Sequence, residues 1–166
     1  MTFHYCPMCA TPLTNRIRGG RLRPVCPACD FIQYRNPTIG VAIVVLDGDQ
    51  ILLGRRAPDS SYPGLWCIPC GHVEWDEEIR AAARREFAEE TGLYVCVADL
   101  IASHSNFHNS AQHTVGVWFY GDVIGGELTA GDDLDRVAYF PLASPPAALA
   151  FPTDRLVLAQ LRDAGL

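Results

Sequence analysis

Three glutamates, Glu86, Glu89 and Glu90, lie three and four residues apart in a stretch that could bind a metal ion. Residues 76–91 contain neither glycine nor proline, and Gly92 follows them, so the stretch predicts a helix. On a helix this spacing puts the three carboxylates on one side, where we expect their oxygens to converge on a hard divalent cation, Mg²⁺ or Mn²⁺. Because Mg²⁺ usually also binds substrate phosphates, the implied substrate is phosphorylated.

The positions of these acids argue against an ordinary solvated helix surface. The apolar stripe expected for the helix consists of Ile79, Ala83 and Phe87. Glu86 and Glu90 fall inside this stripe, where an unpaired carboxylate would be costly. The alternative, exposed carboxylates paired with arginines four residues away, we accept for Glu78. We therefore expect cations to hold Glu86 and Glu90 in place.

Residues 71–93 resemble the Nudix box, G-x5-E-x7-R-E-U-x-E-E-x-G-U, in which U is an aliphatic or bulky apolar residue. Its nine fixed places are filled by Gly71, Glu77, Arg85, Glu86, Phe87, Glu89, Glu90, Gly92 and Leu93. The resemblance implies an α+β fold, an α/β/α sandwich with a mixed sheet. It also implies Mg²⁺-dependent hydrolysis of a nucleoside diphosphate linked to another group.

The resemblance further implies roles for the residues of the box. The catalytic and metal-binding set would be Arg85, Glu86, Glu89 and Glu90. The three glutamates would bind the metal or orient the attacking water, while Glu77 and Arg85 would brace the loop and the glutamates. The carbonyl group before the box glycine often completes the metal shell, and here it belongs to Cys70.

The amino-terminal segment carries two Cys-x2-Cys pairs with sixteen residues between them. The cysteines are Cys6, Cys9, Cys26 and Cys29. This spacing is typical of a zinc ribbon, in which four thiolates close a tetrahedron around a structural Zn²⁺. Two disulfides are the alternative, which we disfavour because no secretory leader precedes the pairs. We expect a zinc ribbon over residues 1–37 and the Nudix domain over residues 38–166.

Charge divides the chain in the same way. Residues 1–37 hold five Arg and one Asp, a charge of +4, and the remainder holds 8 Arg and 18 acids, a charge of −10. The total of −6 argues against non-specific nucleic-acid binding. No run of apolar residues is long enough for a membrane span. We expect a soluble, cytoplasmic protein, and a homodimer stays possible.

Hydrophobic patterns predict the elements around the box. The expected strands cover residues 39–46, 51–55, 64–68, 95–107, 114–123 and 137–140, with an edge strand near 125–128 and a closing helix over 153–162. The runs at 39–46 and 114–123 are apolar throughout, so we expect these two strands to be central.

A third Cys-x2-Cys pair, Cys67 and Cys70, has no second pair nearby. Since neighbouring strand residues alternate between faces, we expect the two side chains to diverge rather than form a redox or metal site. Cys70 replaces the Gly or Ala usual at this place in the family, so oxidation or soft-metal binding beside the catalytic metal stays open. We expect Cys96 to be a small core residue.

Other residues outside the box could contribute to the site. The aromatic and histidine candidates after the box are His104, Phe107, His108 and His113. For these we favour a substrate-lining loop over plain surface residues, and over a metal site. A further acid could come from Glu127, Asp132, Asp133 or Asp135, although a solvated acidic loop explains these residues equally well. Trp75, Phe107, Trp118 and Tyr120 could stack on a base or simply belong to the core.

Features outside the box favour one branch of the family. The stretches 34–37 (Tyr-Arg-Asn-Pro), 64–66 (Gly-Leu-Trp) and 151–155 (Phe-Pro-Thr-Asp-Arg) are similar to zinc-ribbon pyrophosphatases of ADP-ribose and FAD. This likeness implies ADP-ribose or FAD as substrate and AMP as product. NADH pyrophosphatase is the alternative, but residues 102–109 lack the motif of that branch. A nucleotide sensor whose ribbon contacts nucleic acid is the non-enzymatic alternative, and the intact box glutamates argue against it.

Overall fold

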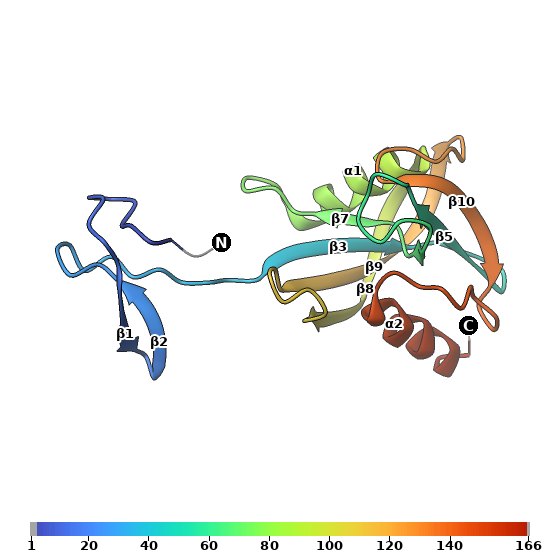
Figure 1. Cartoon of the computed structure of the whole chain (residues 1–166). Helices are drawn as coiled ribbons and strands as arrows, with labels where there is room; N and C mark the ends of the chain where they lie inside the picture. Colours follow the sequence, from blue (N-terminus) through green and yellow to red (C-terminus); the bar gives the residue numbers. More distant parts are fainter. Residues whose placement is uncertain (1–2, 166) are drawn as a thin grey trace. The chain divides into compact units, whose positions relative to one another are not determined.

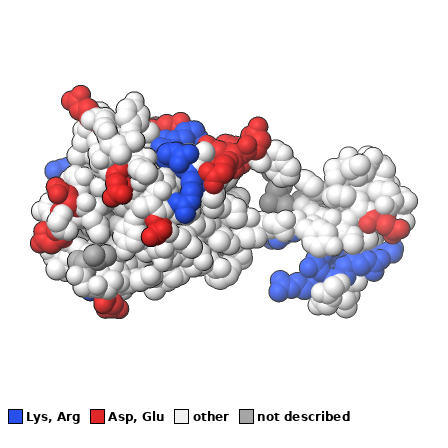
Figure 2. All heavy atoms as spheres, turned by 180° about the vertical axis from the view of Figure 1, so that it is seen from behind, with Lys and Arg blue, Asp and Glu red and all other residues white. Residues whose placement is uncertain are grey.

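The computed structural model describes residues 3–165 and divides at Pro37 into two compact units. The smaller unit is built on an antiparallel hairpin of β1 (Thr14–Arg18) and β2 (Arg21–Val25) (Figure 1). Gly19 and Gly20 form its tip, and their φ angles of 56° and 72° favour glycine because a side chain would be strained there. Figure 2 shows basic side chains gathered on this unit.

The larger unit contains two four-stranded sheets. The first has the order β7-β3-β9-β8, with β3 parallel to β9 and the other pairs antiparallel. Its strands are β3 (Thr38–Val44), β7 (Cys70–His72), β8 (Leu93–Asn106) and β9 (Thr114–Gly126). The second consists of β4 (Leu46–Asp47), β5 (Gln50–Arg56), β6 (Trp66–Cys67) and β10 (Leu134–Pro141). As expected, β3 and β9 are central.

Two helices cover opposite faces of the first sheet (Figure 1). They are α1 (Ile79–Thr91) and α2 (Pro152–Asp163). Because strand side chains alternate, Val41 and Ile43 of β3 pack in one cluster with Phe87 of α1. Ala42, between them, packs in the other cluster with Leu158 of α2. The predicted α/β/α sandwich with a mixed sheet is confirmed.

The helix that carries the box begins three residues later than the sequence predicted. Glu78 is its N-cap, and the Glu78 carboxylate accepts hydrogen bonds from the backbone N–H groups of Arg80 and Ala81. The interpretation of Glu78 as an exposed helix charge was therefore incomplete, because this side chain starts the helix. Gly92 ends it in the left-handed region at φ 70°, as predicted.

Two other expectations were wrong. Residues 127–130 belong to no strand, because their backbone instead closes the end of α1: the N–H groups of Glu127 and Thr129 donate to the carbonyls of Gly92 and Thr91. Cys96 is exposed rather than buried. Alternation along β8 explains its exposure, since Val95 beside it points into the core. Among the described residues, no helix is long and apolar enough to cross a membrane.

Candidate active site

The segment from Ile68 to His72 organises the site because its backbone holds three carboxylates. Every second N–H group along it donates to a different acid. The bonds run from Ile68 N to Asp154 (3.1 Å), from Cys70 N to Glu90 (2.7 Å) and from His72 N to Glu86 (3.1 Å). The three acids are thereby attached to one short segment, whose last three residues form β7.

Arg85 connects the loop before α1 to the glutamates on it. Its guanidinium donates two hydrogen bonds to Glu77 (2.9 and 2.8 Å) and contacts the carboxylates of Glu86 (2.9 Å) and Glu89 (3.0 Å). A further bond of 3.1 Å reaches the carbonyl of His72. The hydrogen bond from Arg85 lowers the pKa of Glu77. Arg85 thus fixes Glu86 and Glu89 relative to the loop, as the bracing role requires.

Glu90 has a different environment, since its side chain is only 1% exposed. Burial raises the pKa of Glu90 well above its usual range, while the N–H of Cys70 and the charge of Arg56 act in the opposite direction. The Arg56 guanidinium lies 3.8 Å from the carboxylate. Glu90 is therefore easier to protonate than an exposed glutamate.

The three box carboxylates are held by different partners. Among residues 3–165, the group found close enough together to hold a metal ion is the cysteine quartet of the smaller unit, whose sulfurs all lie within 4.8 Å of one another. Arg85 draws Glu86 and Glu89 to one side, whereas Glu90 turns inward to Cys70 N and Arg56. The local helix spacing could not show these cations.

The donors of the box nevertheless suit a divalent cation. Carboxylate oxygens are the ligands that Mg²⁺ and Mn²⁺ prefer. Gly71 leaves room for them, because a Cβ atom at this position would lie 2.0 Å from Oε2 of Glu86. Any side chain at residue 71 would therefore displace the carboxylate. Glu89, on the same helix, keeps an exposed carboxylate beside Glu86.

Arg56 is a site residue that the sequence reasoning missed. It is 4% exposed and pairs with Asp133 at 2.8 Å, besides its contact with Glu90. Of the four candidate acids, Asp133 lines the cavity described below and Asp135 instead pairs with Arg55 at 2.7 Å. The feature of the sequence that could have identified Arg56 is its place as a charged residue at the end of β5, a strand with a run of apolar residues.

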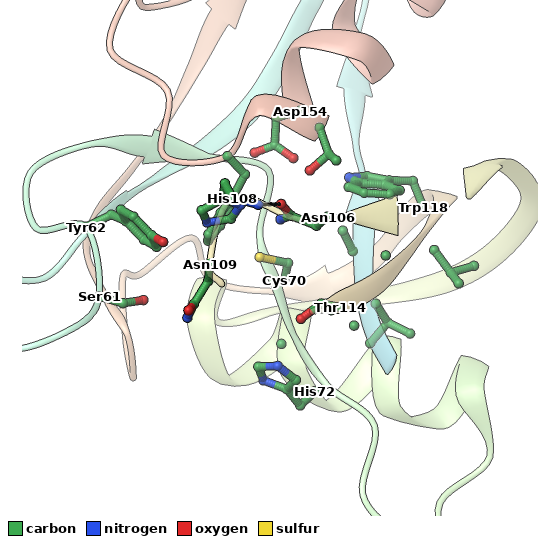
Figure 3. Close-up of a pocket in the computed structure, with 18 of the residues that line it drawn as sticks. Ser61, Tyr62, Cys70, His72, Asn106, His108, Asn109, Thr114, Trp118 and Asp154 are labelled. Carbon is green, nitrogen blue, oxygen red and sulfur yellow. Dashed lines mark hydrogen bonds between the residues drawn. The ribbon is translucent and has the colours of Figure 1, made fainter. Parts of the chain in front are cut away.

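A cavity of about 380 Å³ adjoins the box glutamates along β7. In Figure 3 the Cys70 thiol points into its middle, with Asp154 and Trp118 toward one end and His72 toward the other. Arg56 also lines it, so the cavity meets both His72, whose N–H holds Glu86, and Arg56, which contacts Glu90. Its size suits a nucleoside-sized ligand.

Comparison with known proteins identifies this arrangement. Residues 36–161 match the model of the NUDIX domain, and residues 4–35 match that of the Nudix N-terminal zinc ribbon. The chain belongs to the Nudix family. It is therefore a Nudix-type hydrolase, and this family generally uses a divalent metal ion.

Similar proteins cover most of this Nudix chain. An ADP-ribose pyrophosphatase of Methanocaldococcus jannaschii is 34% identical over 130 residues, which are 78% of this chain and 76% of that protein. The NAD-capped RNA hydrolase NudC of Stutzerimonas stutzeri is 27% identical over 86% of this chain, which spans 50% of that relative. The crystal structure of a NUDIX hydrolase from Nitrosomonas europaea superposes with a TM-score of 0.80 at 28% identity, covering 94% and 88% of the two chains.

The four ribbon cysteines meet as their spacing predicted. The sulfurs of Cys6 and Cys29 lie 3.5 Å apart, as do those of Cys9 and Cys26, and all four lie within 4.8 Å of one another. They are free thiols rather than two disulfides. Soft sulfur ligands in this number fit Zn²⁺, in agreement with the matching Nudix ribbon model.

The expectation that Cys67 and Cys70 diverge was wrong. The Cys67 thiol lies close enough to raise the pKa of Cys70 well above its usual range, and burial raises it further. The two residues belong to β6 and β7, which are in different sheets, so strand alternation does not extend from one to the other. A raised pKa keeps the Cys70 sulfur as a neutral thiol and lowers its reactivity.

The histidine-rich segment contributes in part to the cavity of this Nudix domain. His108 lines it, with ring centroids 5.2 Å from Tyr62 and 5.9 Å from Phe151. His104 packs against Trp118 and His113 against Phe107 instead. Among the described residues, these histidines form no metal cluster.

Of the aromatic candidates for stacking, Trp118 lines the cavity. Trp75 is fully exposed, Phe107 is largely exposed, and Tyr120 packs against a hydrophobic core cluster. The aromatic wall therefore comes mainly from Tyr62 and Phe151, which the sequence analysis did not name as candidates for stacking.

Proposed function

We propose that this Nudix domain hydrolyses the pyrophosphate bond of ADP-ribose, with FAD as the second candidate, and releases AMP. The observation that carries the proposal is the placement of Glu86 and Glu90 beside the cavity by the N–H groups of His72 and Cys70. The relative from M. jannaschii, which is named an ADP-ribose pyrophosphatase, supports the choice of substrate.

Glu86, Glu89, Glu90 and the carbonyl of Cys70 would hold the catalytic ion, for which Mg²⁺ is our first choice and Mn²⁺ the second. The bound ion would neutralise the charge that develops on the phosphate oxygens. The close approach of Glu86 to Gly71 and the oxygen-only character of these donors support this assignment.

The side chains of the domain supply positioning and proton transfer. Arg85 fixes Glu86 and Glu89 through its bonds to both, and Glu77 fixes Arg85 in turn. We assign the general base to Glu90, because the N–H of Cys70 and the guanidinium of Arg56 hold it apart from the two glutamates that Arg85 contacts. Arg56 would hold Glu90 in place while it carries a charge.

A pyrophosphatase acting on NADH or NAD is the second candidate. The NudC relative, which is named an NAD-capped RNA hydrolase, favours it, although this chain spans only half of that protein. A non-catalytic sensor, with the ribbon on nucleic acid, is the third possibility. The basic charge of residues 1–37 favours the sensor, while the complete box opposes it.

The test is incubation of the full chain with Mg²⁺ and a panel of ADP-ribose, FAD, NADH and NAD-capped RNA, with products separated by chromatography. We expect AMP to form fastest from ADP-ribose or FAD. Preference for NADH or capped RNA would establish the second candidate. No turnover of any compound by the zinc-loaded protein would overturn the proposal.

Glu90→Gln separates catalysis from binding. We expect it to lower kcat by about 10²- to 10⁴-fold, the usual worth of a general base, while binding of ADP-ribose persists. Asp122→Asn, which changes an exposed carboxylate on β9, is the matched control and should keep full activity. Equal kcat values for Glu90→Gln and the control would refute the assignment of the base.

The remaining proposals concern the surroundings of the enzyme. We infer a structural Zn²⁺ in the cysteine quartet, a cytoplasmic location, and a small-molecule nucleotide rather than nucleic acid or membrane as the partner. The four clustered sulfurs support the first inference and the acidic larger unit supports the last. A homodimer is possible, and sedimentation of the zinc-loaded chain measures it.

A further inference from the structure

The third Cys-x2-Cys pair combines a thiol in the cavity with a thiol in the core. The Cys70 sulfur points into the cavity (Figure 3), and the residue is partly exposed. Cys67 is 0% exposed and belongs to a hydrophobic core cluster. Both thiols are free, and they interact with each other. Neither sulfur has a part in the proposed hydrolysis.

The backbone around the pair keeps the two thiols together. Cys67 ends β6 and Cys70 begins β7, so only Ile68 and Pro69 separate them. β6 pairs with β5 in the second sheet, and β7 pairs with β3 in the first. The N–H of Ile68 donates to Asp154, and the carbonyl of Pro69 accepts from a backbone N–H of β3 at 3.2 Å. The connection between the two sheets is therefore fixed, and the two sulfurs stay neighbours.

A purely structural role explains only one of the two cysteines. Cys67 is a small buried residue, which is the usual place of a free cysteine. Cys70 instead presents its sulfur to a cavity that small molecules can enter. An accessible cysteine beside a second thiol is the arrangement that forms a disulfide after oxidation, because the second thiol can attack the oxidised sulfur.

We propose that Cys67 and Cys70 form a site of reversible oxidation, at which hydrogen peroxide converts the two thiols into a disulfide that stops hydrolysis. The Cys70 sulfur loses its proton and attacks one peroxide oxygen, which breaks the O–O bond and gives a sulfenic acid and water. The Cys67 sulfur then attacks the sulfenic sulfur, so the S–S bond forms and a second water leaves. The two thiols supply the two electrons that reduce the peroxide, and their protons leave in the water.

The disulfide would act on hydrolysis through the backbone of Cys70. The N–H of Cys70 donates to Glu90 at 2.7 Å, and Glu90 is the proposed general base. A bond to Cys67 draws Cys70 toward the core and so moves this N–H group. A displacement of about 1 Å at a catalytic group lowers kcat about 10²-fold. This effect rests on the proposed function, whereas formation of the disulfide does not.

The first readout is the chemistry of the pair itself. The zinc-loaded full chain is treated with hydrogen peroxide and digested, and the peptide that contains both cysteines is analysed by mass spectrometry. We expect it to be lighter by two hydrogens and to regain them with dithiothreitol. Zinc content, measured in the same samples, reports on the ribbon thiols separately. Sulfinic acid at Cys70 without a disulfide, or a disulfide from Cys70 to another cysteine, would overturn the proposal.

Cys67→Ala removes the second thiol and keeps the cavity. Prolonged peroxide should then oxidise Cys70 to sulfinic acid, which dithiothreitol does not reduce. We expect dithiothreitol to restore the activity of the oxidised wild type but not that of the oxidised variant. Cys96→Ser, which changes an exposed cysteine, is the matched control and should behave like the wild type. The same loss and recovery in Cys67→Ala as in the wild type would overturn the role of Cys67.

Cys70→Ala keeps the proposal testable should Cys67→Ala not fold. The backbone N–H that donates to Glu90 remains, and no disulfide can form at the site. The treated variant should match its own untreated sample in activity, and a loss of activity would place the sensitive group elsewhere and overturn the switch.

Two outcomes separate this site from the proposed function. If the disulfide forms but the reduced protein hydrolyses no compound, the proposed hydrolysis fails and the oxidation site stands. If the reduced protein is active and the disulfide leaves kcat unchanged, the proposed hydrolysis stands and the switch is overturned.

Discussion

The two units of the chain contrast in what holds them together. In the described part of the smaller unit, the fully buried apolar residues are Cys6, Val25 and Cys26, and two of these are ligands of the quartet. The larger unit has apolar clusters on both faces of its central sheet. A metal bound in the ribbon would therefore contribute folding energy, whereas a metal at the box would contribute chemistry.

The Cys-x2-Cys motif shows the same contrast. Cys6 and Cys9 meet a second pair across the hairpin and form a four-sulfur cluster. Cys67 and Cys70 have the same spacing but no second pair, and the hydrogen bond with Cys67, together with burial, raises the pKa of the Cys70 thiol. Spacing alone thus brings two sulfurs together, while the partners supplied by the fold decide whether they can hold zinc.

The largest expected effect is loss of the ribbon fold in Cys26→Ser. In small zinc domains, a structural Zn²⁺ contributes about 10–16 kcal/mol of apparent binding free energy, which acts as folding free energy. Loss of the Zn²⁺ should therefore unfold residues 3–37. Zinc content and limited proteolysis measure the result, with exposed Cys96→Ser as the control. Residues 38–165 should stay folded, because the larger unit has its own apolar clusters. Loss of both units in one transition would contradict it.

The stability of the larger unit should fall as pH rises, because burial raises the pKa of Asp154 from 3.8 to about 7. The folded state holds this proton more tightly than the unfolded chain. The stabilisation that protonated Asp154 gives the folded state is therefore fully present below about pH 4, and it is lost as the pH rises through 7. Between pH 5 and pH 8 the loss is about 3 kcal/mol.

Urea unfolding at pH 5 and pH 8 measures this difference. Asp154→Asn should remove the part that comes from Asp154, because Asn does not titrate, while Asp122→Asn should leave the pH dependence intact. An Asp154→Asn curve with the full wild-type pH dependence would assign the effect to another buried acid, such as Glu90.

Gly71→Ala tests whether the catalytic unit depends on close packing around Glu86. The added Cβ would clash with the Glu86 carboxylate, so this carboxylate must move. A displacement of about 1 Å at a catalytic group can lower activity about 10²-fold. Gly125→Ala is the matched control, since its Cβ would meet Tyr94 at an ordinary 3.9 Å. Equal kcat/KM values for the two variants would argue against a precise role for Glu86.

The smallest effect is expected for Cys67→Ala. If the third cysteine pair holds no metal, the zinc content per chain should equal that of the wild type, with stability lowered by about 1 kcal/mol for a small change in the core. Metal analysis after gel filtration measures the content. A lower zinc content would place a second zinc site at Cys67 and Cys70.

The sequence by itself determined the features that depend on local spacing. The box residues, the end of the helix at Gly92, the ribbon quartet and the central strands β3 and β9 follow from periodicity and motif spacing. The predicted start of α1 was three residues too early. In the sequence, the N-cap residue Glu78 looks like an ordinary acid inside the helix.

Only the tertiary structure decided which distant groups meet. Arg56 reaches Asp133 from 77 residues away, and Ile68 reaches Asp154 across 86 residues. No periodicity in the sequence encodes such pairs, because they depend on how two sheets and two helices pack. The same packing gives the box carboxylates different partners and brings Cys67 close to Cys70. Local spacing therefore specified the chemistry available to this protein, and long-range contacts set the charge and direction of each group.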